Sequence, residues 1–321
     1  MELSRLSTRV DSRDLVFHLD ENVTLVQAAW KDEQCFVEKC GLKDVPDVFE
    51  KRLNSQFKVS DLVNHAPEGS TDNDYPYTLA VFETIRNEGI HDFKGIQFLA
   101  SNGAIVDLTV GSTYNGRMSQ YCKRRIIDGE EYISISGKPI DNVYESAKYG
   151  HAFEEYLTDR SASSKDHYVY AITRLTLANL SFLVKSELDA KMNDDLVEIK
   201  CQQCPSLTSK HILRSKIFRK AHLGMMRSVI FSGVTPGEIE DLPSDQSFQP
   251  TKFDVKDMIA KDEKFHEGFH RCQLICERVL QLFKIHPDID EILVEKKQEE
   301  NDIHFVRVEK KEETEEGGDT K

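Results

Sequence analysis

The segment 186–200 constrains the fold of this chain more than any other stretch. Runs of alternating apolar and charged residues flank the polar pair 193–194, and this pattern predicts two strands joined by a two-residue turn. In that register Asp189 lies directly opposite Glu198. Two carboxylates that face each other across a hairpin repel. A divalent cation held between them would remove that cost.

The same face of the predicted hairpin carries Glu187 opposite Lys200. The other face is apolar and consists of Phe182, Val184, Leu188, Val197, Ile199 and Cys201. The hairpin is therefore apolar behind and acidic in front, with one lysine among the acids, as in the sites of metal-dependent nucleases. The alternative is an ordinary amphipathic hairpin whose charged face is solvated and neutralised by its lysines.

A helix predicted over 141–157 supplies a further carboxylate. Glu154 falls on one stripe of this helix with Ala147, Gly150 and Leu157, at the spacing of an inward face. Gly150 would let another element approach closely. A carboxylate on an inward face needs a partner, because burying an unpaired charge costs several kcal/mol. The alternative is a solvated glutamate beside a merely tolerated glycine.

Taken together, three short motifs resemble the DXO family of RNA decapping exoribonucleases. They are a GxxxE helix at 150–154, an E-hydrophobic-D strand at 187–189 and an E-hydrophobic-K strand at 198–200. Their order, residue types and approximate separations match the family. A weaker resemblance extends from about Leu15 to about Val308.

The expected fold is α+β, with a mixed β-sheet core flanked by helices in one large nuclease-type (PD-(D/E)xK-like) domain. No linker rich in Pro, Gly or Ser divides the chain of 321 residues, which also favours a single domain. We expect this domain to cover 12–308. The segment 309–321 is strongly charged, which predicts an acidic disordered tail.

The resemblance implies a site for two divalent cations, Mg²⁺ or Mn²⁺. Hard cations of this kind prefer oxygen ligands. The implied metal ligands are four carboxylates and one backbone carbonyl, those of Glu154, Glu187, Asp189, Glu198 and Ile199. The same four carboxylates together with Lys200 form the implied catalytic set. Lys200 would orient the attacking water or help to deprotonate it, and would offset charge on the scissile phosphate.

The implied activity is hydrolysis of RNA 5′ ends by a two-metal mechanism. The expected reactions are removal of incomplete or non-canonical caps, such as unmethylated or NAD caps, 5′-triphosphate hydrolysis and 5′–3′ exoribonuclease activity. The expected partners are RNA 5′ ends and, as a further option, a 5′–3′ exoribonuclease.

Two features of the family are not found in this sequence. An arginine followed by glycine normally lines the RNA channel, and the best counterpart here is Asn102 before Gly103. A glutamine normally follows the E-hydrophobic-K strand on the next helix, and within 219–224 His222 is the substitute considered. These departures leave two other functions open. One is a catalytically weakened paralogue that binds RNA ends or a nuclease partner, and the other is a DNA-directed nuclease.

A net charge of −14 argues against broad attraction to nucleic acid, so positive charge must be concentrated locally. The segment 210–220 does so directly after the E-hydrophobic-K strand. We expect Arg214 and Arg219 to bind RNA phosphates, which supply affinity but little sequence information. The alternative is a solvated amphipathic helix. The run 123–125 is a second basic candidate, better explained as the end of a strand.

Seven cysteines without framework spacing indicate a reducing environment. Cys201 and Cys204 form a CxxC pair, but the only similar pair, Cys272 and Cys276, is distant and lies in a predicted helix. Buried or unreactive thiols explain them better than zinc. No apolar stretch reaches transmembrane length. The expected location is therefore intracellular, in the nucleus or the cytoplasm, without membrane association.

Overall fold

The computed structural model describes residues 1–7, 15–31, 34–58, 78–111, 117–137, 145–158, 168–202, 211–233, 247–298 and 300–309. Its largest element is an 11-stranded mixed sheet with the order β1-β17-β16-β7-β8-β6-β10-β9-β3-β4, in which β2 also pairs with β9. The strands are β1 (Glu2–Ser7), β2 (Phe17–Leu19), β3 (Thr24–Lys31), β4 (Gln34–Lys39), β6 (Phe98–Ser101), β7 (Met118–Ile127), β8 (Glu130–Gly137), β9 (Tyr168–Leu177), β10 (Leu180–Glu187), β16 (Glu291–Lys296) and β17 (Asp302–Arg307).

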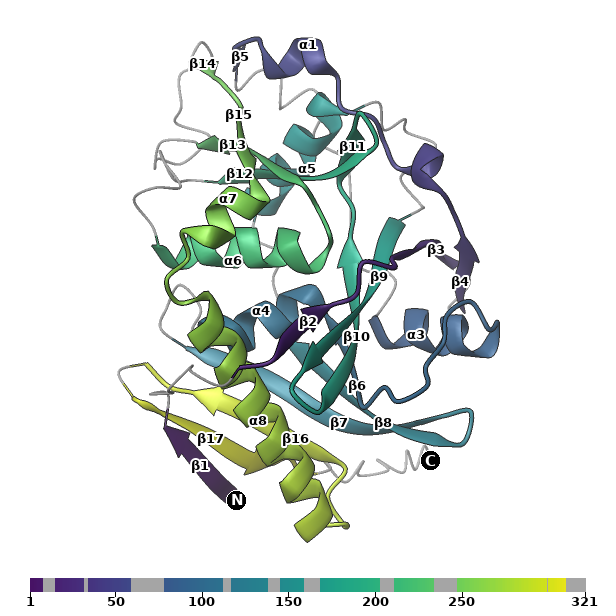
Figure 1. The fold of residues 1–321 in the computed structure, drawn as a ribbon, viewed down its shortest axis with the longest axis vertical. Coiled ribbons are helices and arrows are strands. Elements are labelled where there is room, and N and C mark those ends of the chain that lie inside the picture. Colours follow the sequence, from purple (N-terminus) through teal and green to yellow (C-terminus); the bar gives the residue numbers. More distant parts are fainter. Residues whose placement is uncertain are drawn as a thin grey trace, which may run out of the picture.

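A second, four-stranded sheet lies above the large one in Figure 1. It consists of β11 (Ala190–Met192), β12 (Asp195–Gln202), β13 (Ser228–Gly233) and β15 (Thr251–Asp254). A two-stranded ribbon is formed by β5 (Phe57–Lys58) and β14 (Ser247–Phe248). The helices are η1 (Leu42–Asp44), α1 (Glu50–Leu53), α3 (Thr78–Asn87), α4 (Asn102–Val110), α5 (Glu145–Leu157), α6 (His211–Leu223), α7 (Val255–Ala260) and α8 (Phe265–Ile285). Mixed strands and helices in one domain confirm the predicted α+β class.

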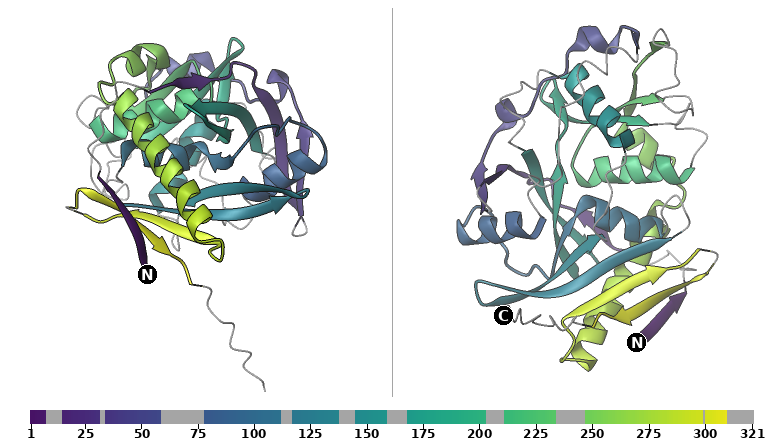
Figure 2. Two further views of the ribbon diagram at one scale, coloured as in Figure 1. Left: turned by 60° about the horizontal axis from the view of Figure 1, so that its bottom comes forward. Right: turned by 180° about the vertical axis from the view of Figure 1, so that it is seen from behind.

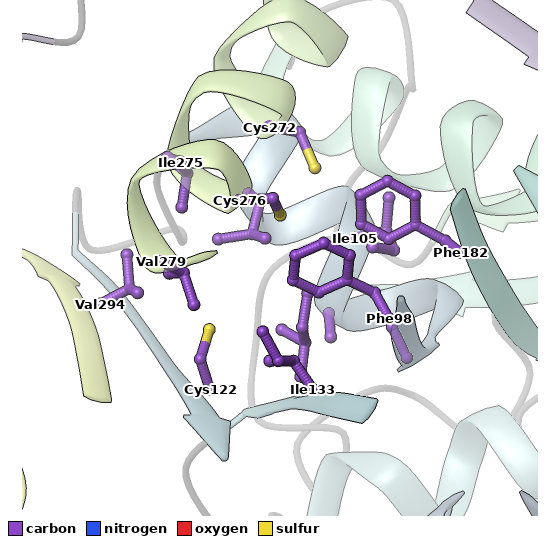
Figure 3. Close-up of a cluster of buried hydrophobic side chains, with 14 of the residues drawn as sticks. Phe98, Ile105, Cys122, Ile133, Phe182, Cys272, Ile275, Cys276, Val279 and Val294 are labelled. Atoms are coloured by element: carbon purple, nitrogen blue, oxygen red, sulfur yellow. The ribbon is translucent and has the colours of Figure 1, made fainter. Parts of the chain in front are cut away.

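The main hydrophobic core lies between the large sheet and the helices α4 and α8 (Figure 3). The rings of Phe98 on β6 and Phe182 on β10 stack with their centroids 4.8 Å apart. Cys272 and Cys276 lie buried on α8 within this core, as the sequence predicted. Among the described helices, none is both long enough and apolar enough to cross a bilayer.

The small sheet is covered on both faces. Helix α5 packs against one face, with Phe153 and Leu157 meeting Val197 and Ile199 of β12. Helices α6 and α7 cover the opposite face (Figures 1 and 2). Because side chains alternate along β12, Val197 and Ile199 face α5, while Leu196, Glu198 and Lys200 lie on the other side of the strand. This alternation carries two charged residues into the interior.

The hairpin predicted within 186–200 forms around the expected turn. Asn193 and Asp194 both have positive φ, at 51° and 65°, as a two-residue type I′ turn requires. Ala190 pairs with Val197, a register that places Asp189 beside Glu198.

The predicted pairing of Glu187 with Lys200 is wrong. Glu187 ends β10 in the large sheet and pairs with Tyr170 of β9. The chain crosses from the large sheet to the small one between Glu187 and Ala190. A single continuous strand is therefore replaced by a junction between two sheets.

The large sheet also includes residues ahead of position 12, where the sequence placed the start of the domain. β1 pairs with β17, so both ends of the described chain meet at one edge of the sheet. The tail predicted at 309–321 lies outside the described residues except for Glu309, as do residues 141–144 of the predicted helix and Cys204.

The strain of the I′ turn makes Asp194 a test of the hairpin. We expect Asp194→Gly to raise the free energy of unfolding by about 0.5–1 kcal/mol, because glycine adopts positive φ without steric cost. Asp195→Gly is the matched control. Asp195 lies in β12, so glycine there is expected to destabilise the protein by a similar amount. Urea denaturation measures both, and equal destabilisation by the two variants would contradict the turn.

Candidate active site

Three carboxylates from separate elements converge on the ammonium of Lys200. Its Nζ lies 3.1 Å from Glu198 Oε1, 3.3 Å from Asp189 Oδ2 and 3.6 Å from Glu154 Oε1. Glu198 and Lys200 come from β12, Asp189 from the junction between the sheets, and Glu154 from α5. The structure thus brings together four of the residues that the sequence selected.

Asp189 is held in place by the backbone of the neighbouring strand. β11 pairs with β12 only along Asp195–Val197, and the Ile199 N–H donates a 2.7 Å hydrogen bond to Asp189 Oδ2. The carboxylate thereby takes the place of a ladder partner. The side chain of Ile199 is fully buried against α5. Its contact with the carboxylate cluster is the hydrogen bond from its N–H to Asp189.

A second ammonium reaches the same cluster from helix α6. Lys220 Nζ lies 3.0 Å from Glu198 Oε1, and Glu198 is completely buried. Among the described residues, no group donates a hydrogen bond to Glu198 Oε2. Glu198 Oε1 therefore forms ion pairs with two ammoniums, whereas Glu198 Oε2 is buried without a hydrogen-bond donor from the described residues.

Glu187 approaches the cluster from the end of β10 and interacts electrostatically with Lys220 and with Lys185. It is half-buried, which leaves it more open to solvent than the other three carboxylates.

Burial and ion pairing compete at these residues. Burial alone would raise the pKa of Asp189, but Lys200, Lys220 and the Ile199 N–H outweigh it and lower that pKa. Burial prevails at Glu198 and raises its pKa despite the two ammoniums. Burial would lower the pKa of Lys200, but Asp189, Glu198 and Glu154 raise it well above the ordinary value. Lys200 is therefore held as an ammonium, a charge-balancing cation rather than a ready proton acceptor.

The four residues predicted to bind substrate are not gathered around the carboxylates. Asn102 is buried at the start of α4, and its Nδ2 donates to the Lys220 carbonyl at 3.5 Å. His222 stacks on Phe17 with ring centroids 5.8 Å apart, and burial alone lowers its pKa.

Arg214 and Arg219 line a cavity of about 550 Å³ beside the N-terminal part of α6. Arg219 is buried, and its Nε donates to Asp262 at 2.8 Å while its Nη1 donates to the Thr109 carbonyl at 3.1 Å. Arg214 is half-buried and contacts His211. Arg219 is thus occupied by internal contacts, and Arg214 is the freer of the two.

No family model matches the sequence, and no curated protein matches it. Solved structures do match. Rai1 of S. pombe, solved with 3′-FADP, aligns with a TM-score of 0.70 at 13% identity, over 95% of this chain and 99% of that chain.

Two further solved structures match this chain over most of its length. Dxo1 of K. lactis, solved with manganese, has a TM-score of 0.64 at 13% identity and covers 95% of this chain and 98% of its own. Candida albicans Rai1, solved with pU5-Mn²⁺, has a TM-score of 0.65 at 9% identity, over 95% and 93%. The chain has the fold of the DXO family. This confirms the family resemblance and the mixed-sheet fold predicted from the three motifs.

The DXO resemblance implies a divalent cation, and the donor set suits one. Carboxylate oxygens are the ligands that hard cations prefer, and Glu198 Oε2 is a buried acceptor without a hydrogen bond from the described residues. As they stand, no three Asp, Glu, His or Cys side chains in the described part of the chain are close enough to hold an ion. The Lys200 ammonium instead lies among three of the carboxylates, and Lys220 pairs with Glu198.

Two lysines that interact with the candidate carboxylates were not selected from the sequence. Lys220 falls on the inward stripe of α6 with Leu213 and Ile217, at i, i+4 and i+7, and that spacing was the available signal. Lys185 lies two residues before Glu187 on the same face of β10, with its Nζ 4.0 Å from the centroid of the Tyr170 ring.

Lys185 gives the site a testable pH dependence. Burial, the largest influence, lowers the pKa of Lys185 to about 8, while Glu187 opposes the shift. The unfolded chain has the higher pKa, so it binds more protons between about pH 8 and pH 10.5, and stability from this group rises with pH there. We expect Lys185→Met to be more stable than the wild type at pH 7, and the difference to shrink by up to about 3 kcal/mol by pH 10.

Urea denaturation of both proteins at pH 7, 8, 9 and 10 measures this difference. A difference that stays constant across the series would show that Lys185 does not carry its charge into a buried site.

Proposed function

We propose that this protein is a metal-dependent hydrolase of RNA 5′ ends. Its reactions would be removal of incomplete or non-canonical caps such as unmethylated or NAD caps, hydrolysis of 5′-triphosphates, and 5′–3′ exoribonuclease activity. Such substrates imply a place of action in the nucleus or cytoplasm. The predicted exoribonuclease partner stays a prediction.

One observation carries this proposal: Glu154, Asp189 and Glu198 surround Lys200 inside the DXO fold. Burying several carboxylates is costly, and a hydrophobic interior would be cheaper for stability alone. A cluster of this kind, at the junction of two sheets, is typical of a functional site. The structures with this fold include one with manganese and one with pU5-Mn²⁺, which supports a divalent cation and an RNA ligand.

In the proposed reaction the carboxylates of Glu154, Glu187, Asp189 and Glu198 would hold the cation. The backbone carbonyl of Ile199 would be the fifth ligand. The cation, Mg²⁺ or Mn²⁺, would supply Lewis-acid stabilisation of negative charge on the phosphoryl group. The Ile199 N–H would keep Asp189 oriented through its 2.7 Å hydrogen bond.

Lys200 would then act as a fixed positive charge. Its ammonium sits among three carboxylates and would orient the attacking water and offset charge on the scissile phosphate. Arg214, which lines the cavity beside α6, would add phosphate contacts. For Asn102, Arg219 and His222 we propose an indirect role, because the first two are buried and His222 is half-buried against Phe17.

A second candidate is a catalytically weakened paralogue that binds RNA ends. The observation that favours it is the number of internal ion pairs. Lys200 and Lys220 neutralise the carboxylates, and Arg219 is paired with Asp262. This candidate would bind RNA without releasing product.

The neighbouring residues Glu154 and Glu155 provide a matched test. Purified protein is incubated with 5′-triphosphate, unmethylated-cap and NAD-capped RNAs in Mg²⁺ or Mn²⁺. We expect Glu154→Gln and Glu198→Ala to lower the release of product by about 100-fold or more, because each removes a carboxylate of the cluster. Glu155→Gln should retain activity, since Glu155 is not among the carboxylates around Lys200.

Thermal unfolding of each variant shows whether its fold survives. Metal-dependent product from the wild type, lost in the first two variants, would establish the enzyme and identify its preferred end. Full activity in folded Glu198→Ala would refute the assigned site. Binding of all three RNAs without any product would favour the paralogue.

A further inference from the structure

Lys220 places a positive charge inside a site that is expected to hold metal ions. Its ammonium lies 3.0 Å from Glu198 Oε1, and it also interacts electrostatically with Asp189 and Glu187. It comes from an inward position of α6, whose neighbouring residues Ile217 and Ala221 are buried. Packing of the helix therefore fixes the lysine at the cluster.

The formal charges of the cluster leave room for one divalent cation. Four carboxylates, those of Glu154, Glu187, Asp189 and Glu198, carry four negative charges, and the ammoniums of Lys200 and Lys220 carry two positive ones. A charge of −2 remains, the Lys185 ammonium that interacts with Glu187 reduces it to −1, and one Mg²⁺ or Mn²⁺ ion brings the total to +1. A second ion would bring the total to +3 in a largely buried site, where Coulomb repulsion is poorly screened.

The two lysines are not equivalent in this balance. Lys200 contacts three carboxylates at the centre of the cluster. Among the described carboxylates, Lys220 lies within ion-pair distance only of Glu198, while Asp189 and Glu187 are farther from it. The remaining Glu198 oxygen, Oε2, is buried and receives no hydrogen bond from the described residues. Lys220 is therefore the cation that a divalent ion at Glu198 would have to displace or tolerate.

We infer that the Lys220 ammonium takes the place of one divalent cation at Glu198, so that the site binds a single Mg²⁺ or Mn²⁺ ion. The inference deepens the proposed function and rests on it for the presence of a metal. It replaces the two ions that the family resemblance implies by one ion and one lysine.

Mn²⁺ binding to the full-length protein, measured by titration calorimetry and by EPR of the free ion, tests this without any RNA. We expect one ion per wild-type chain. Lys220→Gln should bind two ions, or bind Mn²⁺ tighter by about tenfold, because a unit charge beside Glu198 is removed. Lys220→Arg keeps the charge and should bind one ion.

The matched control is Lys216→Gln. Lys216 lies one turn earlier on α6 but pairs with Asp107 at 2.5 Å, so its removal should leave the stoichiometry at one. The wild-type stoichiometry decides the question even where a variant fails to fold. Two ions bound to the wild type would overturn the inference, and so would equal stoichiometry and affinity in folded Lys220→Gln.

The outcomes separate this inference from the proposed function. One Mn²⁺ ion bound without turnover of any RNA would refute the hydrolase and leave the inference standing. Two ions with metal-dependent turnover would do the reverse. No Mn²⁺ bound to the wild type or to Lys220→Gln would overturn the inference and the metal requirement together.

Discussion

Burial of charge at the junction of two sheets is the constraint on which the rest of this structure depends. Asp189 and Glu198 are 4% and 0% exposed. An unpaired carboxylate at such depth is unstable, so cations must be supplied from nearby. Lys200 lies on the same strand as Glu198. Lys220 comes from α6, which covers the face of the small sheet opposite to α5. The cluster thus ties β12, α5 and α6 together, which makes the packing of the small sheet inseparable from its charge balance.

The crossing of the chain between sheets explains why the acids meet where they do. Glu187 ends a strand of the large sheet, and Asp189 begins the approach to the small one. After Val197, β12 is no longer paired with β11, although its pairing with β13 continues. On the side that β11 leaves open, the Asp189 carboxylate accepts the hydrogen bond from the Ile199 N–H. An interrupted ladder therefore creates both the space and the hydrogen bond that hold the carboxylate. A continuous hairpin would have satisfied that N–H with backbone and left Asp189 on an ordinary charged face.

Local patterns in the sequence were sufficient for the turn and for the inward glutamate. Asn193 and Asp194 tolerate positive φ, and the alternation on either side of them determines the register that brings Asp189 to Glu198. Glu154 was found because helical spacing places it among buried residues. The partner of Glu187 was missed, because a period-2 pattern does not reveal that one strand is shared between two sheets.

Tertiary contacts, rather than local patterns, decided the remaining residues. Asn102 and His222 are polar residues beside motifs, but the packing of α4 against α6 buries Asn102, and His222 is half-buried against Phe17. Lys220 was predicted only as part of a basic helix, outside its apolar stripe, and a lysine at an inward position of α6 requires an acid opposite it. Only the fold brings Glu198 there.

Three basic residues of α6 form internal ion pairs, which changes how this acidic protein can attract RNA. Lys216 is paired with Asp107, Arg219 with Asp262 and Lys220 with Glu198. The basic residues of α6 that were expected to bind phosphates thus mostly form internal ion pairs. Arg214 lines the cavity beside this helix. With a net charge of −14, long-range electrostatics repel a polyanion. In the proposed function, attraction for a 5′ phosphate must therefore come chiefly from the divalent ion at the carboxylates. The ion would then serve binding as well as chemistry, and the charge that Lys220 contributes beside it would act on both.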